Sequence, residues 1–493
     1  MGQRLDFSAV SHRQTLDKKS FKTQLPALRA ELLTVQHDLR EADFPVIVVF
    51  AGVDGAGKHE TVNVLNEWLD PRWIITRAYD QPSEEEAKRP RWWRYWRDLP
   101  PAGQIGLFLS SWYSEPLVDF VHHRSSEEAF NTRLANIAQF ERSLVDNGAL
   151  ILKFWMHLDR DAQRERFERL EQDQQLRWQL RDSDWVNWAR YDRFQAAAQC
   201  LMDSTHAAGR SWQLVDGYDE RHRSTTVAKA IAAAVKQRMQ NPPERPAAEY
   251  RLGGQQLDQL NMQQAMSKPD AKQRIKSLQA ELALLHRQAV DRGISTTIVF
   301  EGWDAAGKGG AIRRLIHPLE AKNYRVIPIA APTKEELAHH YLWRFWRHVP
   351  RDGKVTIFDR SWYGRVLVER VEGFCSEADW QRAYQEINEF EQALSDHGGV
   401  LCKFWLHITP EEQLTRFEDR KVTPYKAWKL TDEDWRNREQ WDAYLQAAED
   451  IFANCSPESA PWTLVEANSK PFARVKVLET VCARLREALG QPA

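Results

Sequence analysis

Residues 301–309 read EGWDAAGKG, and residues 51–59 read AGVDGAGKH. Each stretch carries the pattern G-x-x-x-x-G-K, and each lies between a short apolar run and a helical pattern. In that setting the glycines let consecutive backbone N–H groups face phosphate oxygens, while the lysine and the helix N-terminus add positive charge. The pattern therefore predicts a phosphate-binding loop in each half of the chain.

The two loops belong to a longer duplication with a constant offset. Gly302 and Lys308 follow Gly52 and Lys58 by 250 positions, and the same offset relates SSWY to RSWY and LKFWMHL to CKFWLHI. A repeat of this length indicates two fused domains rather than a solenoid. We expect a first domain over 1–240, a linker rich in proline and polar residues over 241–254, and a second domain over 255–493.

Strand and helix patterns alternate within each half. The sequence predicts amphipathic helices at 25–40 and 273–290. The apolar runs that read as buried strands lie at 44–52, 105–109, 149–156, 295–302, 355–359 and 399–406. This alternation predicts an α/β fold with two tandem P-loop domains, each a parallel β-sheet flanked by helices.

Composition narrows the class of protein. The 68 lysines and arginines nearly balance 70 aspartates and glutamates, which argues against a general nucleic-acid-binding protein. The five cysteines form no C-x-x-C pair, as expected for reduced thiols. No apolar run approaches the roughly 18–20 residues of a membrane helix, and the N-terminus lacks the apolar core of a signal peptide. We therefore expect a cytoplasmic protein without a nucleic-acid or membrane partner.

The second loop departs from the usual pattern directly after its lysine. Gly309 stands where a serine or threonine hydroxyl normally helps to hold Mg²⁺, so the metal needs other oxygen ligands. Asp304 inside the loop and Asp359 at the end of an apolar run are the predicted ligands. The cofactor expected at this site is Mg²⁺, with Mn²⁺ as an alternative.

The two halves differ in charge where the chemistry is expected. Asp304 is matched by Asp54, whereas Asp359 is matched by Leu109. Cations of the second half without a cationic counterpart include Lys334, Arg360, Arg365, Arg420, Lys421, Lys426 and Lys429. Losing one transition-state charge contact typically costs about 10²-fold in rate. We therefore expect the first half to be a structural or regulatory copy and the second half to be catalytic.

The reaction class follows from the residues that the second half offers. It shows no Ser/His/Asp or Cys/His nucleophile set and no Cys/His metal cluster. Phosphoryl transfer needs mainly positioning and charge neutralisation, and a phosphate acceptor is already largely ionised at pH 7. The excess of cations over candidate bases favours a phosphate acceptor over a sugar hydroxyl.

The segments EGWDAAGKGG, FDRSWYGR, CKFW and RFEDRKVTPYKAWK, in this order, resemble the polyphosphate kinase 2 family. That family is similar to thymidylate kinase in its P-loop core and has a helical lid. The two-copy arrangement is similar to its polyphosphate:AMP phosphotransferase subgroup. The resemblance implies Mg²⁺-dependent transfer of the terminal phosphate of inorganic polyphosphate onto AMP, giving ADP, in the C-terminal domain.

The resemblance also implies roles for individual residues. Lys308 and the loop amides would hold the transferring phosphate, and Asp304 and Asp359 would hold the metal. The loop positions are Gly302, Ala305, Ala306, Gly307 and Gly309. Phosphates would be bound by Arg360, Arg365 and Lys403, and the lid would close over the polyanion through Arg416, Arg420, Lys421, Lys426 and Lys429. Because Lys153 preserves Lys403 in the first half, a structural role for Lys403 is the alternative.

Three other functions remain open at this level. An ATP-dependent nucleoside monophosphate kinase would share the loop and differ in the donor. A polyphosphate kinase acting mainly on nucleoside diphosphates would differ in the acceptor. A phosphate-sensing scaffold without catalysis is the third. Two fused copies also resemble a dimer of single-domain relatives, which leaves a homo-oligomer possible.

Overall fold

The computed structural model describes residue 7, residues 13–423 and residues 432–491. Within this range each half contains a parallel five-stranded sheet, with strand orders β2-β3-β1-β4-β5 and β10-β9-β6-β8-β7. Read from the opposite edge, the second order repeats the first. The predicted α/β fold with two tandem P-loop domains is confirmed.

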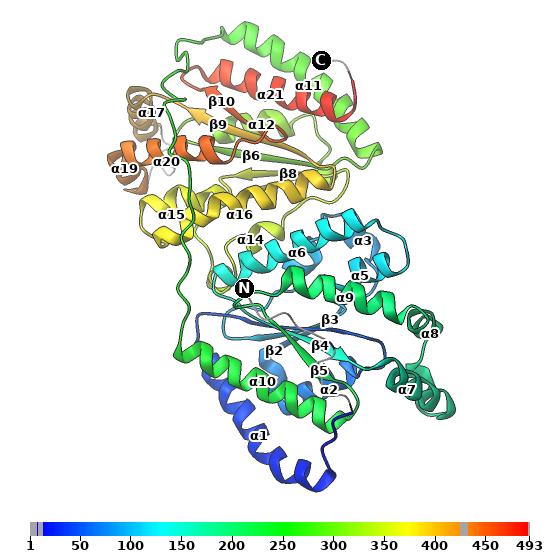
Figure 1. The fold of residues 1–493 in the computed structure, drawn as a ribbon. Coiled ribbons are helices and arrows are strands. Elements are labelled where there is room, and N and C mark those ends of the chain that lie inside the picture. The colour runs from blue at the N-terminus through cyan, green and yellow to red at the C-terminus, as the bar shows by residue number, and fades with distance from the viewer. Residues whose placement is uncertain (1–6, 8–12, 424–431, 492–493) are drawn as a thin grey trace. The chain divides into compact units, whose positions relative to one another are not determined.

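The elements of the first half run in the order of the duplication (Figure 1). They are α1 (Lys18–Leu39), β1 (Val46–Gly52), α2 (Lys58–Trp68), η2 (Pro71–Trp73), β2 (Ile74–Ala78), α3 (Glu84–Ala87), α4 (Trp93–Arg97), β3 (Ile105–Leu109), α5 (Ser114–Val121), α6 (Glu127–Asp146), β4 (Leu150–His157), α7 (Arg160–Gln172), η3 (Arg177–Gln179), α8 (Asp182–Trp188), α9 (Tyr191–Thr205), β5 (Trp212–Asp216) and α10 (Glu220–Gln240).

The second half repeats this series. Its elements are α11 (Lys268–Asp291), β6 (Thr296–Gly302), α12 (Lys308–Ile316), η4 (Ala321–Asn323), β7 (Tyr324–Pro328), α13 (Lys334–Leu337), α14 (Trp343–Trp346), β8 (Val355–Asp359), η5 (Trp362–Val366), α15 (Val368–Val371), α16 (Glu377–Asp396), β9 (Val400–His407), α17 (Pro410–Val422), α19 (Asp432–Glu439), α20 (Trp441–Asn454), β10 (Trp462–Glu466) and α21 (Lys470–Ala488).

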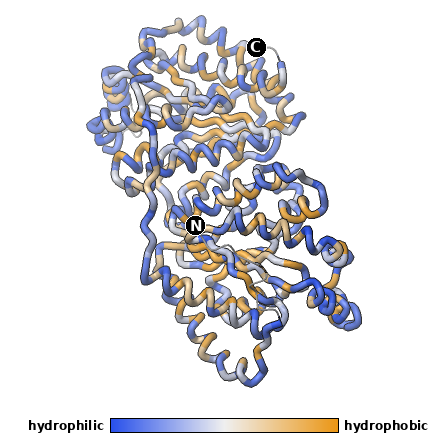
Figure 2. The backbone as a smooth tube through the Cα atoms, viewed as in Figure 1, coloured by the Kyte–Doolittle hydropathy of each residue, from blue (hydrophilic) through white to orange (hydrophobic). Residues whose placement is uncertain are grey.

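The central strands form where the sequence predicts them because they are covered on both faces. One face of the first sheet carries α1, α2 and α10 and the other carries α5, α6 and α9, so β1, β3 and β4 read as continuous apolar runs. Figure 2 shows the hydrophobic residues concentrated along these inner strands. The strands β2 and β7 lie at sheet edges and are only partly buried, so they carry no such run.

The chain divides into two compact units that do not follow the duplication throughout. One unit contains residues 1–81, 98–245 and 337–340, and the other contains residues 82–97, 246–336 and 341–493. The second unit thus includes a short segment of the first half. Inside that unit the ring of Trp96 stacks on that of Trp346, with centroids 5.8 Å apart.

Part of the predicted linker packs along α20 within the second unit. The backbone N–H groups of Arg251 and Gly253 donate to the side chains of Asn454 and Asp450, at 2.8 and 2.7 Å. A Cβ on Gly253 would stand 2.1 Å from the backbone carbon of Glu449, so only glycine allows this close approach.

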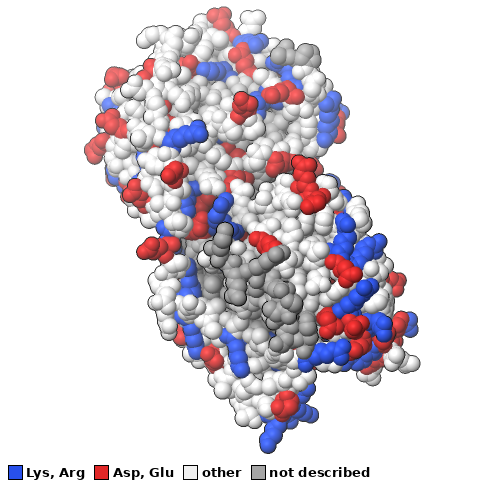
Figure 3. Space-filling view, viewed as in Figure 1, with Lys and Arg blue, Asp and Glu red and all other residues white. Residues whose placement is uncertain are grey.

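Charged side chains of both signs are interspersed on the surface. On the face drawn in Figure 3 they are densest over α7 and α8, where ion pairs such as Arg164–Glu168 and Arg13–Glu165 form. In the described parts of the chain, no helix is both long and apolar enough to cross a membrane.

Candidate active site

The glycine loop of the second half joins the central strand β6 to helix α12. Gly302 ends the strand with φ 126°, and a Cβ there would stand 2.3 Å from the carbonyl oxygen of Leu406. Gly307 caps α12 with φ 113° and leaves the first-turn N–H groups without a side-chain cap. Lys308 Nζ donates to the carbonyl oxygens of Gly302 and Trp303, at 2.6 and 3.2 Å. The loop therefore has the conformation that binds phosphate.

A cavity of about 550 Å³ lies beside this loop. It is lined by Trp303, Asp304, Ala305, Ala306, Gly307, Lys308, Gly309, Gly310, Arg313, Pro328, Ile329, Asp359, Arg360, Arg420, Glu433, Asp434 and Asn437. The structure thus brings together most of the predicted loop residues, both predicted metal ligands and two predicted phosphate-binding arginines. Because the sheet is parallel, the ends of β6 and β8 meet at this edge.

Asp304 is held at the centre of a hydrogen-bond network. Arg360 Nη2 donates to its Oδ1 at 3.0 Å, and Asn437 Nδ2 donates to its Oδ2 at 3.1 Å. Burial alone would raise the pKa of Asp304, but the charges of Lys308 and Arg360 and the two hydrogen bonds hold that pKa below its ordinary value. Asp304 is therefore ionised at neutral pH, the state in which a carboxylate binds hard cations.

Arg360 reaches the loop from a strained backbone position. Its φ is 65°, in the left-handed region that non-glycine residues rarely adopt, and its N–H donates to the carbonyl oxygen of Phe300 at 3.0 Å. Burial opposes its positive charge, but Asp304 and Glu301 raise the pKa of Arg360 above its ordinary value. Strain of this kind persists where the surrounding structure holds it, commonly at functional sites.

Arg416 supports the loop from outside the cavity. It is buried, and its guanidinium donates to the carbonyl oxygens of Ala305 and Ala306 at 2.9 and 3.0 Å and to that of Ala467 at 2.6 Å. The carboxylate of Glu412 accepts a hydrogen bond from Arg416 Nε at 2.6 Å. These bonds make Arg416 a support of the loop, and its predicted contact with polyphosphate stays a prediction.

Lys403 lies in a buried ion pair away from the cavity. Its Nζ donates to Glu391 at 2.7 Å, to the Tyr363 hydroxyl at 3.1 Å and to the Cys455 carbonyl oxygen at 2.7 Å. Lys153 in the first half makes the same three contacts, with Glu141, Tyr113 and Thr205. This geometry favours the structural alternative for Lys403 over phosphate binding.

The remaining predicted cations are dispersed. Arg365 pairs with Glu369 at 3.0 Å and lies 4.4 Å over the ring of Tyr341, outside the cavity lining. Lys421 Nζ lies 4.5 Å over the ring of Trp435. Lys426 and Lys429 fall outside the described residues, so their predicted role in the lid stays a prediction.

Several cavity residues were not predicted from the sequence. The repeat could have identified Asn437, because Asn187 occupies the same position in the first half. Asn187 makes the equivalent bond to Asp54, at 2.8 Å. Arg313 replaces Asn63 of the first half, a difference in charge that could also have been noticed.

Glu301, beneath the loop, was missed as well. It is 5% exposed and accepts a hydrogen bond from Ser361 Oγ at 2.7 Å. Burial raises the pKa of Glu301 above its ordinary value, against the opposing effects of Ser361, Lys308 and Arg360. The first half has Ala51 at this position.

The loop of the first half keeps the backbone shape but changes what surrounds it. Glu60 stands in the first turn of α2, where the second half has Gly310, and pairs with Arg166 at 2.6 Å. A Cβ on Gly57 would stand 2.2 Å from the guanidinium carbon of Arg223, whereas a Cβ on Gly307 would meet nothing within 4 Å. An extra carboxylate and an inserted guanidinium thus crowd the first loop.

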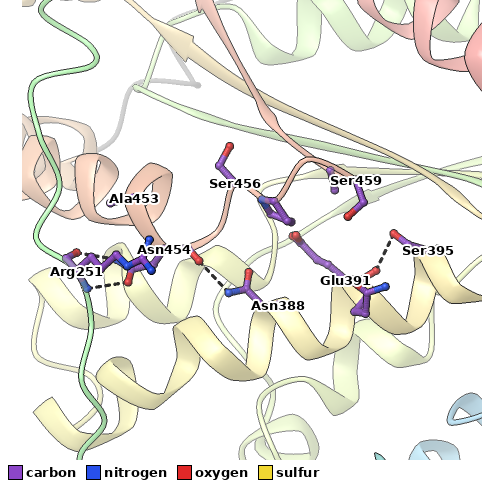
Figure 4. A pocket seen from close by; sticks show the side chains of 11 residues that line it. Arg251, Asn388, Glu391, Ser395, Ala453, Asn454, Ser456 and Ser459 are labelled. Carbon is purple, nitrogen blue, oxygen red and sulfur yellow. Dashed lines mark hydrogen bonds between the residues drawn. The ribbon is translucent and has the colours of Figure 1, made fainter. Parts of the chain in front are cut away.

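A second cavity in the same unit differs in character. It measures about 320 Å³ and lies among α16, α20 and the loop that leads into β10 (Figure 4). Asn388 Nδ2 donates to the Asn454 carbonyl oxygen there at 2.8 Å, and Arg251 is the single lysine or arginine of its lining. This cavity lies at the amino end of β10, away from the phosphate loop, and lacks the cations that a polyanion needs.

Comparison with known proteins identifies the family. The family model for polyphosphate kinase 2 matches residues 15–243 and again residues 265–491. A polyphosphate:AMP phosphotransferase from Pseudomonas aeruginosa is 46% identical over 96% of this chain and 97% of its own length. One from Pseudomonas syringae pv. tomato is 42% identical over 98% of this chain and 99% of its own length.

A solved structure supports the same assignment. A crystal structure from Pseudomonas aeruginosa PA01, described as polyphosphate kinase 2, has a TM-score of 0.89 and 44% sequence identity. The match covers 97% of this chain and 98% of that one. The chain therefore belongs to the polyphosphate kinase 2 family, with one copy of the family's domain in each half.

Proposed function

We propose that the protein transfers the terminal phosphate of inorganic polyphosphate to AMP, forming ADP, and that the second half carries out the reaction with Mg²⁺. The full-length relatives named polyphosphate:AMP phosphotransferase support the substrates. The observation that carries the assignment to the second half is the cavity beside Lys308. This cavity is lined by the phosphate loop, by the carboxylates Asp304 and Asp359, and by cations that include Arg360.

The chemistry required of the side chains is mainly electrostatic. A phosphate oxygen of AMP forms the new bond to phosphorus, and the bond from that phosphorus to the oxygen of the next phosphate in the chain breaks, so the polyphosphate is shortened by one unit. The AMP phosphate is largely ionised at pH 7, so no general base is needed. Asp304, already bonded to Arg360 and Asn437, is arranged for charge neutralisation rather than proton abstraction.

The loop and the arginines would bind the phosphates. The first-turn N–H groups of α12 and Lys308 Nζ face a chain phosphate at the loop, and Lys308 exchanges its bonds to Gly302 and Trp303 for phosphate oxygens. Arg360 and Arg420 line the same cavity and would neutralise the remaining phosphate charge.

Asp304 and Asp359 are the residues that would hold the metal. Both line the cavity, and ionised carboxylates are the ligands that Mg²⁺ and Mn²⁺ prefer. Among the described residues no group of three or more His, Cys, Asp or Glu forms a metal cage, so phosphate oxygens and water would complete the coordination, as is usual for Mg²⁺. The bound cation would offset negative charge on the donor and acceptor phosphates.

The first half lacks this arrangement. Leu109 and Ser110 replace Asp359 and Arg360 at the end of the corresponding strand, and Glu60, paired with Arg166, stands in the first turn of α2 where the second half has Gly310. We infer that this half contributes no turnover.

The two copies provide matched variants for the test. Purified protein is incubated with AMP, Mg²⁺ and either polyphosphate or ATP, and ADP is measured by chromatography. Polyphosphate-dependent ADP should disappear in Lys308→Ala and Asp304→Asn and persist in Lys58→Ala and Asp54→Asn. If ADP forms from AMP with ATP but not with polyphosphate, polyphosphate is rejected as the donor. Equal losses in the paired variants would reject the division of labour between the halves.

A further inference from the structure

Glu301 and Ser361 connect the two strands that carry the active-site carboxylates. Glu301 is the second-last residue of β6, and Ser361 lies two residues after β8 ends at Asp359. Ser361 Oγ donates to Glu301 Oε1 at 2.7 Å, and both side chains are buried. The bond therefore ties the base of the phosphate loop to the turn that bears Asp359 and Arg360.

That turn needs to be held. Arg360 has φ 65°, and a bulky side chain is disfavoured in this region unless its surroundings fix it. The adjacent restraints include the backbone bond from Arg360 to Phe300, the ion pair with Asp304, the bond from the Tyr363 N–H to Ser361 Oγ and the Ser361–Glu301 bond. Of these, only the last joins two side chains that do not line the cavity.

The first half shows what happens to the fold without Glu301. Ala51 occupies its position, and the hydroxyl of Ser111, the counterpart of Ser361, has no hydrogen-bond partner among the residues that the structure describes. The strand and the turn still form, since β1 spans Val46–Gly52 and Ser110 also has a positive φ of 47°. The fold thus tolerates alanine here, and the bond is present in the half that has Asp359 and Arg360.

We propose that Glu301 is a positioning residue for phosphoryl transfer, which acts by accepting the Ser361 hydrogen bond and so aligns Asp359 and Arg360 with the loop. The inference rests on the proposed function in so far as it places Glu301 beneath that same site. The hydrogen bond, rather than the charge of Glu301, carries the effect.

The matched pair Ser361→Ala and Ser111→Ala tests this directly. A misplacement of about 1 Å in an active site can cost about 10²-fold in rate. We expect Ser361→Ala to lower kcat by roughly 10- to 100-fold with the KM for AMP changed less than about threefold. Ser111→Ala should match the wild type. Thermal unfolding of each variant shows whether the comparison concerns folded protein.

Three further variants separate alignment from structural damage. Glu301→Gln keeps an acceptor for Ser361 and should retain turnover within about threefold, whereas Glu301→Ala should lose about as much as Ser361→Ala. The double variant Glu301→Ala/Ser361→Ala should be no slower than Ser361→Ala, which already removes this bond together with the bond from the Tyr363 N–H to Ser361 Oγ at 3.3 Å. Wild-type turnover in Ser361→Ala, or losses that multiply in the double variant, would overturn the proposal.

Calorimetric titration with tripolyphosphate supplies a readout independent of turnover. Misalignment of Arg360 should weaken binding about tenfold in Ser361→Ala and leave it unchanged in Ser111→Ala. If the wild type forms no ADP from polyphosphate but this difference in binding is found, the proposed function fails and the positioning role stands. Unchanged tripolyphosphate binding in Ser361→Ala counts against the positioning role, whatever the enzyme's activity.

Discussion

Arg360 Nη2 lies 3.0 Å from Asp304 Oδ1, which joins the turn after β8 to the phosphate loop after β6. Neither residue is a neighbour of the other in sequence, and the first half lacks the pair because Ser110 replaces Arg360. In this ion pair a guanidinium and a carboxylate of the site neutralise each other. In the proposed reaction, phosphate would replace Asp304 at Arg360 and a metal cation would replace Arg360 at Asp304, each with the same sign of charge as the group it displaces.

Replacing Arg360 should therefore impair catalysis more than folding. We expect Arg360→Ala to lower kcat by about 10²- to 10³-fold, as for loss of one charged transition-state contact. Because Arg360 helps to hold the pKa of Asp304 down, the acid limb of the pH–rate profile should also move to higher pH. Steady-state kinetics across pH measures both, and Ser110→Ala serves as the control. An unchanged profile with full activity would contradict the role of the pair.

Lys403 offers a test of structure against phosphate binding. Lys403→Met leaves Glu391 buried without its partner, which should reduce the free energy of unfolding by about 3–5 kcal/mol. Lys153→Met should do the same in the first half through Glu141. Urea unfolding measures the loss, and kcat per folded molecule should stay near the wild-type value in both variants. A selective loss of turnover in Lys403→Met, with folding intact, would instead assign Lys403 to phosphate binding.

Glu60 of the first half suggests a single substitution that should weaken phosphate binding at the loop of the second half. Gly310→Glu copies Glu60 into the first turn of α12 beside the cavity, where the carboxylate would compete with phosphate for the positive end of the helix dipole. We expect tripolyphosphate binding to weaken by more than about tenfold. The reverse change, Glu60→Gly, should create no activity, since Leu109 and Ser110 remain. Titration calorimetry and the ADP assay measure the two results, and normal binding by Gly310→Glu would refute the argument.

His407 should make stability depend on pH. Burial lowers its pKa from 6.5 to about 4, and its Nδ1 accepts a hydrogen bond from Trp303 Nε1 at 3.0 Å. The unfolded chain takes up a proton near pH 6.5 and the folded chain only near pH 4. Stability is therefore fully present above about pH 6.5 and falls as pH drops toward 4, by at most about 3 kcal/mol.

The variant His407→Gln keeps an acceptor for Trp303 without a titrating group. The fall in thermal midpoint between pH 6.5 and 4 should be smaller in this variant than in the wild type. Equal slopes for the variant and the wild type would show that His407 does not titrate in this way.

The architecture was largely predictable because its central strands are buried on both faces. Burial of that kind requires uninterrupted apolar residues, and β3 and β8 begin and end where the apolar runs at 105–109 and 355–359 do. The edge strand β7 was not predicted, because partial exposure permits residues such as Arg325. The glycine loops were recognisable because only glycine suits backbone positions such as Gly302.

The amino-acid order by itself established the duplication, the two phosphate loops and the loss of Asp359 and Arg360 from the first half. Residue type, however, does not specify burial or partners, which depend on packing between segments far apart in the chain. Lys308 follows a buried strand and Lys403 lies within one. Lys308 lines a cavity, however, whereas Lys403 is neutralised by Glu391. Folding alone assigned Arg416 to support of the loop and brought Glu301 against Ser361, since each contact spans 60 residues or more of sequence.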